Sequence, residues 1–335
     1  MAPYIVEKDP LEQLNLSLFS IQPVPGKGTG VVARFDIEKG ERIIYEKPLF
    51  TIPAFSTANQ IDKVERDIAA TLKTLSKDEQ RQFLSLHNNF PGKQPFNGIV
   101  RTNALPCGSA ASVGGVYPKI CRINHSCIPN AHNSWNSKVK CESIHAIRSI
   151  KAGEEITISY DKGEPQESRR NSLRNAFGFD CSCTLCNLPP DAVQASDTRR
   201  LQIQILDNAI GDSNRVMNRP GECLADCYSL LHILDEEYEG SAFALKARLY
   251  YDAFQISISH SDQARALVFA ERGYKSRIIC EGEDSPETQK MKGLMFNPAA
   301  HSSFGFSRRW RTAKELVPQG LDDGDFEKWL WRLRK

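Results

Sequence analysis

The sequence predicts an α+β fold whose first half is rich in short strands and whose second half is helical. Runs of β-branched residues broken by glycine turns occur before residue 160, and such runs are typical of strands. After about residue 195, apolar residues recur every three or four positions, which is the period of an amphipathic helix. The densest cysteine group, Cys181, Cys183 and Cys186, lies between these regions and marks their boundary.

Length and composition describe an ordinary globular protein of about two domains. The chain has 335 residues, of which 40% are apolar and 25% charged, and a domain typically has roughly 150 residues. The formal net charge of +2 gives no strong signal for nucleic-acid binding. No run of about 20 apolar residues and no signal peptide is found. The ten cysteines are too sparse for a disulfide scaffold, which favours the nucleus or the cytoplasm.

The first predicted elements are a β-hairpin or meander followed by two helices. Residues 30–52 are rich in β-branched side chains and contain a turn at Lys39-Gly40, which is typical of strands joined by a turn. From about residue 59 to 88, apolar residues recur at helical steps. Ser76 and Glu79 form a capping box that starts the second helix. We expect these helices to be an insertion in the β-rich domain.

Strands are expected to resume after a region that glycine and proline interrupt. That region covers residues 91–118, and strand-like sequence returns at 138–147 and 154–160, on either side of a turn. We assign residues 1–190 to the β-rich domain and residues 191–335 to an α-helical C-terminal domain. The paired helices expected there are similar to a tetratricopeptide-type (TPR-like) array, although no strict period of about 34 residues is present.

The cysteine group at 181–186 predicts a structural zinc site. Its C-x-C-x-x-C spacing on a turn can bring three thiolates to one cation at metal–sulfur distances of about 2.3 Å. Spacing alone leaves the fourth ligand open among Cys107, Cys121, Cys127, Cys141 and a histidine such as His125. The alternative is a group of partly buried thiols without a metal, but such crowding is unusual in a chain with few cysteines.

Four short motifs occur in a fixed order along the chain. Residues 25–30 form a glycine-rich loop before a strand, residues 122–130 form a polar segment that contains Asn-His-Ser-Cys, and residues 153–160 read G-E-E-I-T-I-S-Y. The cysteine group closes the set. In order and separation these motifs resemble the SET-domain protein methyltransferases, most closely the SMYD-type branch and its fungal relatives. The resemblance extends over about residues 20–190.

The resemblance implies a knotted SET fold in which the polar segment passes beneath the loop that carries the G-E-E-I-T-I-S-Y motif. A pocket for the methyl donor S-adenosylmethionine would lie on one side and a channel for the substrate lysine on the other. By motif position, the donor-binding residues would be Lys27, Gly28, Thr29, Gly30, Asn103, Asn124, His125, Tyr160 and Phe179. Zinc in the post-SET segment would be bound by Cys127, Cys181, Cys183 and Cys186.

Tyr160 occupies the position of the family's active-site tyrosine. Methyl transfer from a sulfonium requires alignment of the amine, the methyl carbon and the sulfur, with water excluded, but it requires no metal. A free lysine has a pKa of about 10.4, so an apolar channel and the nearby sulfonium would help the amine to lose its proton. We therefore expect the Tyr160 hydroxyl to orient and polarise the reacting groups rather than to act as a base.

The resemblance also implies the partners. Residues 51–98 contain no cysteine, so the MYND zinc module that SMYD-type proteins usually carry is absent, and the predicted helices take its place. The acceptor would be an accessible lysine of a protein, with a histone as one candidate, and the chain is expected to be a monomer. Acidic stretches at 235–237 and 281–284 would suit a groove for a basic histone tail, unless they are ordinary helix surface.

Two alternatives remain beside the lysine methyltransferase. The first is a catalytically silent binding module that keeps the SET fold and the zinc and recruits partners through its helical domain. The second is a methyltransferase that acts on a small molecule. The intact donor loop and Tyr160 favour an active enzyme over a silent one, whereas the sequence does not separate protein acceptors from small-molecule acceptors.

Overall fold

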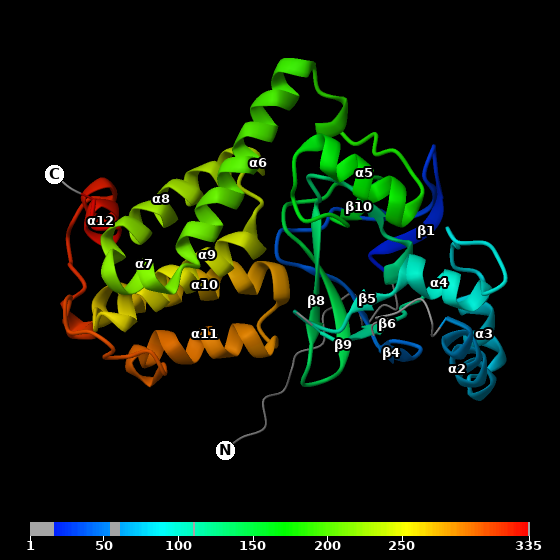
Figure 1. Cartoon of the computed structure of the whole chain (residues 1–335), viewed down its shortest axis with the longest axis horizontal. Coiled ribbons are helices and arrows are strands. Elements are labelled where there is room, and N and C mark those ends of the chain that lie inside the picture. The colour runs from blue at the N-terminus through cyan, green and yellow to red at the C-terminus, as the bar shows by residue number, and fades with distance from the viewer. Residues whose placement is uncertain (1–16, 54–60, 110, 334–335) are drawn as a thin grey trace.

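The computed structural model describes residues 17–53, 61–109 and 111–333. Short strands gather in one part of the molecule and long helices in the other (Figure 1), so the predicted α+β fold class is confirmed. The two parts meet where the long helix α10 (Gln263–Glu281) packs against strands β8 (Ala131–Asn136) and β9 (Cys141–Ala146).

A four-stranded sheet brings the sequence motifs together. Its order is β1 (Phe19–Val24), β2 (Gly28–Ala33), β10 (Glu155–Ile158) and β7 (Asn124–His125). β1 and β2 form an antiparallel hairpin, and its turn holds Gly26 and Gly28 at φ angles of 72° and 73°, a conformation that favours glycine. β7 runs parallel to β10, with Asn124 opposite Thr157. The polar segment and the G-E-E-I-T-I-S-Y motif are therefore neighbours.

The predicted hairpin or meander over residues 30–52 is wrong. Gly40 makes the expected turn, with φ at 89°, but β2 pairs with β1 and β10, whereas β3 (Arg42–Glu46) pairs with β9 in a separate sheet. Val31, Val32 and Ala33 are all buried. Because successive side chains of a strand point to opposite faces, both faces of β2 are covered. Burial of its faces does not select the partners of β2; the pairing does, because β1 and β10 occupy its two hydrogen-bonding edges and leave none for β3.

The helical insertion predicted at about 59–88 is present over its described residues. It consists of α2 (Ile61–Thr74) and α3 (Lys77–Leu84); residues 59 and 60 lie outside the described residues. The Ser76 hydroxyl accepts from the Glu79 N–H, and the Glu79 carboxylate accepts from the Ser76 N–H. Both helices pack with α4 (Pro95–Asn103), which was not predicted. A small sheet follows in the order β4 (Thr51–Pro53), β6 (Val113–Gly115) and β5 (Leu105–Pro106).

The C-terminal region is built from long helices around its own core. α6 begins at Pro190, shortly before the predicted start near residue 195. The helices are α6 (Pro190–Ile210), α7 (Ser213–Asn218), α8 (Pro220–Glu237), α9 (Phe243–Ser259), α10, α11 (Pro286–Phe296) and α12 (Asp323–Leu330). Their core includes Phe254, Phe269 and Trp331, which are fully buried. Each of α8, α9 and α10 packs against the next helix; the TPR-like identity and the boundary at 190/191 stay predictions.

The described helices bear on two further questions: whether the chain could cross a membrane, and whether its acidic stretches could bind a basic partner. None of them is both long and apolar enough to cross a membrane. The carboxylates of the acidic stretches at 235–237 and 281–284 form ion pairs with cations of the same chain, which reduces the charge that they offer to a basic partner. Glu237 is buried and accepts from Arg200 Nε at 2.6 Å. The other ion pairs are Asp235–Lys246, Glu236–Arg199, Glu281–Arg277, Glu283–Lys292 and Asp284–Arg42.

Candidate active site

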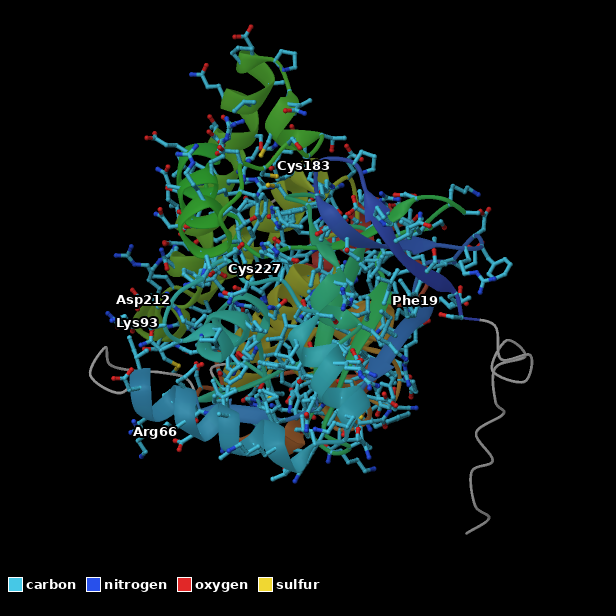
Figure 2. The ribbon with its side chains drawn as sticks, turned by 90° about the vertical axis from the view of Figure 1, so that its right-hand side faces the viewer. Phe19, Arg66, Lys93, Cys183, Asp212 and Cys227 are labelled. Atoms are coloured by element: carbon cyan, nitrogen blue, oxygen red, sulfur yellow. The ribbon has the colours of Figure 1, made fainter. Side chains whose placement is uncertain are left out.

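A cavity of about 610 Å³ opens where the motif segments meet the cysteine group. Its walls come from the β1–β2 turn, the loop after α3, the start of β7 and residues 177–183 at and after the end of α5 (Gln166–Phe177). Cys183 is labelled in Figure 2 beside the blue ribbon of β1 and β2, whose turn lines the same cavity. Small-molecule sites typically measure roughly 300–1,000 Å³, so this cavity has the size to hold one.

The predicted donor-binding residues converge on this cavity, with one exception. Those that line it are Lys27, Gly28, Thr29, Asn103, Asn124, His125, Tyr160 and Phe179. Gly30 does not line it. A Cβ atom at Gly30 would lie 2.6 Å from Val24 Cγ2 and 2.7 Å from Asn124 Nδ2, which is too close for a real side chain. The structure therefore places Gly30 behind Asn124, where it makes room for the amide.

Glu155 joins two cavity residues that come from distant segments. Its carboxylate accepts from Lys27 Nζ at 2.6 Å and from Asn124 Nδ2 at 2.8 Å. Asn124 Nδ2 also lies 3.4 Å from the carbonyl oxygen of Thr29. Glu155 was not predicted as a site residue, although its place in the G-E-E-I-T-I-S-Y motif was a signal. The β1–β2 turn and the polar segment are thereby held against the same side chain.

Asn130 fastens the polar segment to β10. Its Nδ2 donates to the carbonyl oxygen of Glu155 at 2.8 Å and to Glu154 Oε1 at 3.0 Å, and its Oδ1 accepts from the Thr157 N–H at 2.8 Å. Asn130 is buried, and a buried amide stabilises a fold only when its hydrogen bonds are made. This network holds β10, which ends two residues before Tyr160, against the polar segment.

Tyr160 follows the end of β10 and faces the cavity. Its hydroxyl donates to the backbone carbonyl of Ile123. Its ring packs against Phe177 and His125, at centroid separations of 4.7 and 5.4 Å. Burial raises the pKa of Tyr160 above its ordinary value, so the phenol stays protonated at neutral pH. It can orient a neighbouring group by hydrogen bonding, but it is not suited to remove a proton.

His125 contacts the backbone at Tyr160. The Tyr160 N–H donates to His125 Nδ1 at 2.9 Å. Burial lowers the pKa of His125, although the Asp161 carboxylate opposes this effect. The imidazole is therefore neutral at neutral pH.

One cavity wall was not predicted from the sequence. It is formed by Ser85, Leu86, His87, Asn88 and Asn89, which follow α3. His87 Nε2 lies 2.7 Å from Asn89 Oδ1, and Asn103 Nδ2 donates to the carbonyl oxygen of His87 at 2.7 Å. Three consecutive hydrogen-bonding side chains, His-Asn-Asn, directly after an amphipathic helix were the available signal. Phe177, two residues before Phe179, was missed as well.

The four predicted zinc ligands gather in one cluster. The Sγ atoms of Cys127, Cys181, Cys183 and Cys186 all lie within 4.8 Å of one another, and all four residues are buried. Cys127 Sγ is 3.9 Å from Cys181 Sγ and 3.6 Å from Cys186 Sγ. Four sulfurs in a tetrahedron at about 2.3 Å from zinc would be about 3.8 Å apart. The donor set and its spacing therefore fit a tetrahedral zinc ion.

Two buried arginines lie against this cysteine cluster. Arg169 Nη2 is 3.9 Å from Cys186 Sγ, and Arg200 Nη2 donates to the carbonyl oxygen of Cys127 at 3.2 Å. Both arginines are buried. Because four thiolates carry more negative charge than one divalent cation neutralises, nearby guanidinium groups would stabilise the loaded cluster. Arg200 belongs to α6, so the helical region contributes to the surroundings of the cluster.

Comparisons with known proteins identify the family to which this chain belongs. The family model described as "SET domain" matches residues 28–161. Over 288 residues the chain is 33% identical to the histone-lysine N-methyltransferase set5 of Schizosaccharomyces pombe, which covers 85% of this chain and 86% of that protein. The chain therefore belongs to the SET-domain lysine methyltransferase family.

Shorter stretches match SMYD-type proteins. The chain is 32% identical over 130 residues to the Homo sapiens histone-lysine N-methyltransferase SMYD3, covering 37% of this chain and 30% of that protein. It is 24% identical over 233 residues to the Homo sapiens N-lysine methyltransferase SMYD2, covering 63% of this chain and 51% of that protein. The resemblance to the SMYD-type branch and its fungal relatives is thus confirmed.

Proposed function

We propose that this protein transfers a methyl group from S-adenosylmethionine to the side-chain amine of a lysine in a protein substrate. The observation that carries the proposal is the convergence of the glycine-rich turn, the polar segment and Tyr160 on one cavity of about 610 Å³. Membership of the SET-domain lysine methyltransferase family supports the same reaction.

The residues around the cavity suit a donor that carries an amino-acid end. The Lys27 ammonium, which also pairs with Glu155, can attract a ligand carboxylate, and the Asn124 amide, held by Glu155, adds polar atoms to the same wall. Gly28 lets the backbone approach the ligand, since it has no side chain and has φ at 73°. When bound, S-adenosylmethionine supplies an electrophilic methyl group on its sulfonium. The chain's own residues have to hold that end still and exclude water.

Tyr160 is assigned to the reaction itself. Its hydroxyl, on a residue that lines the cavity, is held in place by the Ile123 carbonyl, so its dipole is fixed. Such preorganised groups stabilise charge as it changes during transfer, without having to reorganise. Phe177 and Tyr160 provide aromatic faces that would desolvate the lysine amine and so favour its neutral, nucleophilic form.

We assign the cysteine cluster to a structural zinc ion. Four thiolates leave no open coordination position for water or substrate, which is typical of structural rather than catalytic zinc. Cys181 and Cys183 of the cluster also line the cavity. Bound zinc would therefore hold the wall that includes Phe179 in place, and its loss would loosen the donor site.

The names of the relatives favour a protein as the acceptor. The Schizosaccharomyces pombe and SMYD3 proteins are named histone-lysine N-methyltransferases, whereas SMYD2 is named an N-lysine methyltransferase. Histones are therefore the first substrates to test, and other proteins the second. We propose a monomer that acts in the nucleus, the cytoplasm or both.

A transfer assay with tritiated S-adenosylmethionine tests this function. Histones, whole-cell extract and a mixture of small-molecule amines are offered side by side to the zinc-loaded protein. We expect the wild-type protein, but not Tyr160→Phe, to transfer label to a protein fraction. Label only in small molecules would favour the small-molecule enzyme. No transfer to any acceptor, with donor binding retained, would favour a catalytically silent module.

A further inference from the structure

The His125 ring touches three different groups between the active-site tyrosine and the cysteine cluster. Its side chain is fully buried. Nδ1 accepts from the Tyr160 N–H at 2.9 Å. On the opposite side of the ring, Nε2 lies 3.3 Å from Cys127 Sγ and 3.4 Å from Asp161 Oδ2. The ring thus bridges the end of β10 and a predicted zinc ligand.

The contact with Tyr160 decides which ring nitrogen carries the proton. A backbone N–H is always a donor, so His125 Nδ1 must be unprotonated in order to accept it. The proton of the neutral imidazole is then on Nε2. A protonated Nε2 cannot also bind a metal ion. The ligand atoms of His125, Cys127 and Asp161 lie within 4.8 Å of one another, and the position of the proton makes them a hydrogen-bonded group rather than a second metal site.

Both acceptors are well placed for the Nε2–H. The Asp161 side chain is 3% exposed. Its Oδ1 accepts from the Gly163 N–H at 2.6 Å, and its Oδ2, which also lies 3.4 Å from Ser159 Oγ, has a second lone pair for the ring. A cysteine thiolate bound to zinc keeps lone pairs that accept hydrogen bonds, and partners of this kind orient metal ligands and tune their basicity. Asp161 directly follows Tyr160, so the ring contacts two consecutive residues of the same segment.

We propose that the His125 imidazole is a positioning residue that ties the backbone at Tyr160 to the cysteine cluster. It does so by accepting from Tyr160 and donating to Cys127 and Asp161. The proposal rests on the proposed function, because the position of Tyr160 matters for methyl transfer. Without the ring, the four thiols still gather around zinc. The end of β10, however, loses its link to them, and the Tyr160 hydroxyl loses its fixed place beside the Ile123 carbonyl.

Three substitutions separate the two sides of the ring. His125→Phe keeps a planar ring and removes both nitrogens. His125→Asn places an amide near the position of Nδ1, and His125→Gln places one near the position of Nε2. His260→Gln is the matched control, since His260 is also buried and its Nε2 lies 2.9 Å from the carbonyl oxygen of Val216. That residue lies at the end of α9, outside the cavity lining.

The absorption spectrum of the cobalt-substituted protein reports directly on the hydrogen bond between His125 and Cys127. Co²⁺ replaces zinc in cysteine sites, and its thiolate absorption bands respond to hydrogen bonds at the sulfur. We expect about one Co²⁺ per chain in each variant, as in the wild type. The bands should shift in His125→Phe and His125→Asn but keep the wild-type position in His125→Gln and His260→Gln. Single-turnover transfer at saturating donor should fall about 10- to 100-fold in His125→Phe.

Unchanged cobalt bands and an unchanged single-turnover rate in His125→Phe would overturn the proposal. If that variant does not fold, the wild type still tests it. NMR of protein with ¹⁵N-labelled histidine should show the Nε2–H tautomer for the histidine that Co²⁺ shifts most, and an Nδ1–H tautomer would contradict the tie. If the wild type binds cobalt with the expected tautomer and band shifts but transfers no methyl group, the tie is supported and the proposed function fails.

Discussion

At the scale of single residues, the hydroxyl of Tyr160 is the group on which transfer should depend most. Tyr160→Phe keeps the ring that packs on Phe177 and removes only the hydroxyl. We expect donor affinity, measured by calorimetry, to change little. The single-turnover rate at saturating donor should fall by about 10²-fold or more, the scale for losing one preorganised polar group. Tyr45→Phe, on a tyrosine that is 42% exposed, is the control.

The opposite result for Tyr160→Phe would reassign the residue. A large loss of donor affinity with an unchanged rate at saturating donor would make Tyr160 a binding residue. Asn124→Ala provides the comparison, because its amide contacts Glu155 and the donor loop rather than the expected path of the methyl group. In that variant, donor affinity should fall more than the single-turnover rate at saturating donor.

Gly30 is predicted to control donor binding through its neighbour. An added methyl group in Gly30→Ala would meet Asn124 Nδ2, so the amide has to move. We expect weaker donor binding in calorimetry with little change in the single-turnover rate. In Gly28→Ala no atom lies within 4 Å of the added carbon, but φ is 73°. That variant should lose about 1 kcal/mol of unfolding free energy, and its donor binding should also weaken, because the added carbon lies where the backbone approaches the ligand. Equal donor affinity in Gly30→Ala and wild type would count against this role.

Residues with a local signal could be predicted, and those with only tertiary partners could not. The Asn-His-Ser-Cys motif contains both Asn124 and Cys127, so the family resemblance could place both at the site, although spacing alone left the fourth cysteine of the cluster open. Gly30 was grouped with the donor loop because the sequence does not show that Gly30 packs against Asn124. Glu155 and His87 reach the site through β10 and through the loop after α3. Their roles depend on how separate segments pack.

At the scale of elements, zinc should stabilise the segment that forms one cavity wall. Cys181→Ser removes one ligand of the cluster. We expect zinc content, measured by atomic emission after reduction and dialysis, to fall from about one per chain to near zero. Thermal stability and donor affinity should fall together, because metal binding and folding of such a site are linked.

Cys280→Ser is the matched control for the cluster. Cys280 is buried in α10, and its Sγ donates to the carbonyl oxygen of Ser276 at 3.4 Å, a bond that serine can keep. Zinc content should be that of the wild type. Less than about half an equivalent of zinc in carefully reduced wild-type protein would contradict the assignment of the cluster to zinc.

A helix or strand could be predicted where residues close together in the sequence are enough to determine it. The capping box of Ser76 and Glu79 starts α3 as expected, because it involves only residues that are close together in the sequence. The pairing of β2 and β3 was wrong, because β1 and β10, which lie outside residues 30–52, occupy both edges of β2. α4 was missed because Gly98 lies inside it; a side chain there would collide with Asn88, so the glycine serves packing rather than a turn.

At the scale of the whole molecule, buried titratable groups predict a dependence of stability on pH. Burial raises the pKa of Glu142, on β9, from 4.5 to about 7. Between these values the folded state binds more protons than the unfolded state. The free energy of unfolding therefore falls as the pH rises through this range, by on the order of 3 kcal/mol, and the loss is complete above about pH 7.

The variant Glu142→Gln tests this directly in urea denaturation. It should be more stable than the wild type at about pH 8 and similar to it at about pH 5, where Glu142 is protonated. A stability difference that does not vary with pH would contradict the assignment.

Below neutral pH, two buried histidines should also affect stability. Burial lowers the pKa of His132 to about 4 and that of His145 to about 3. The wild type and Glu142→Gln should therefore both lose stability as the pH falls below about 6.5.

The central claim is that the whole chain moves a methyl group to lysine, and one measurement tests it most directly. The zinc-loaded protein is incubated with S-adenosylmethionine that carries a trideuterated methyl group, together with the acceptor fraction found by the tritium assay. Peptide mass spectrometry should then locate the deuterated methyl group on a lysine Nζ, and Tyr160→Phe should leave that peptide unlabelled over the same time. Deuterated methyl groups found only on other side chains or on small molecules, or equal labelling by Tyr160→Phe, would contradict the account.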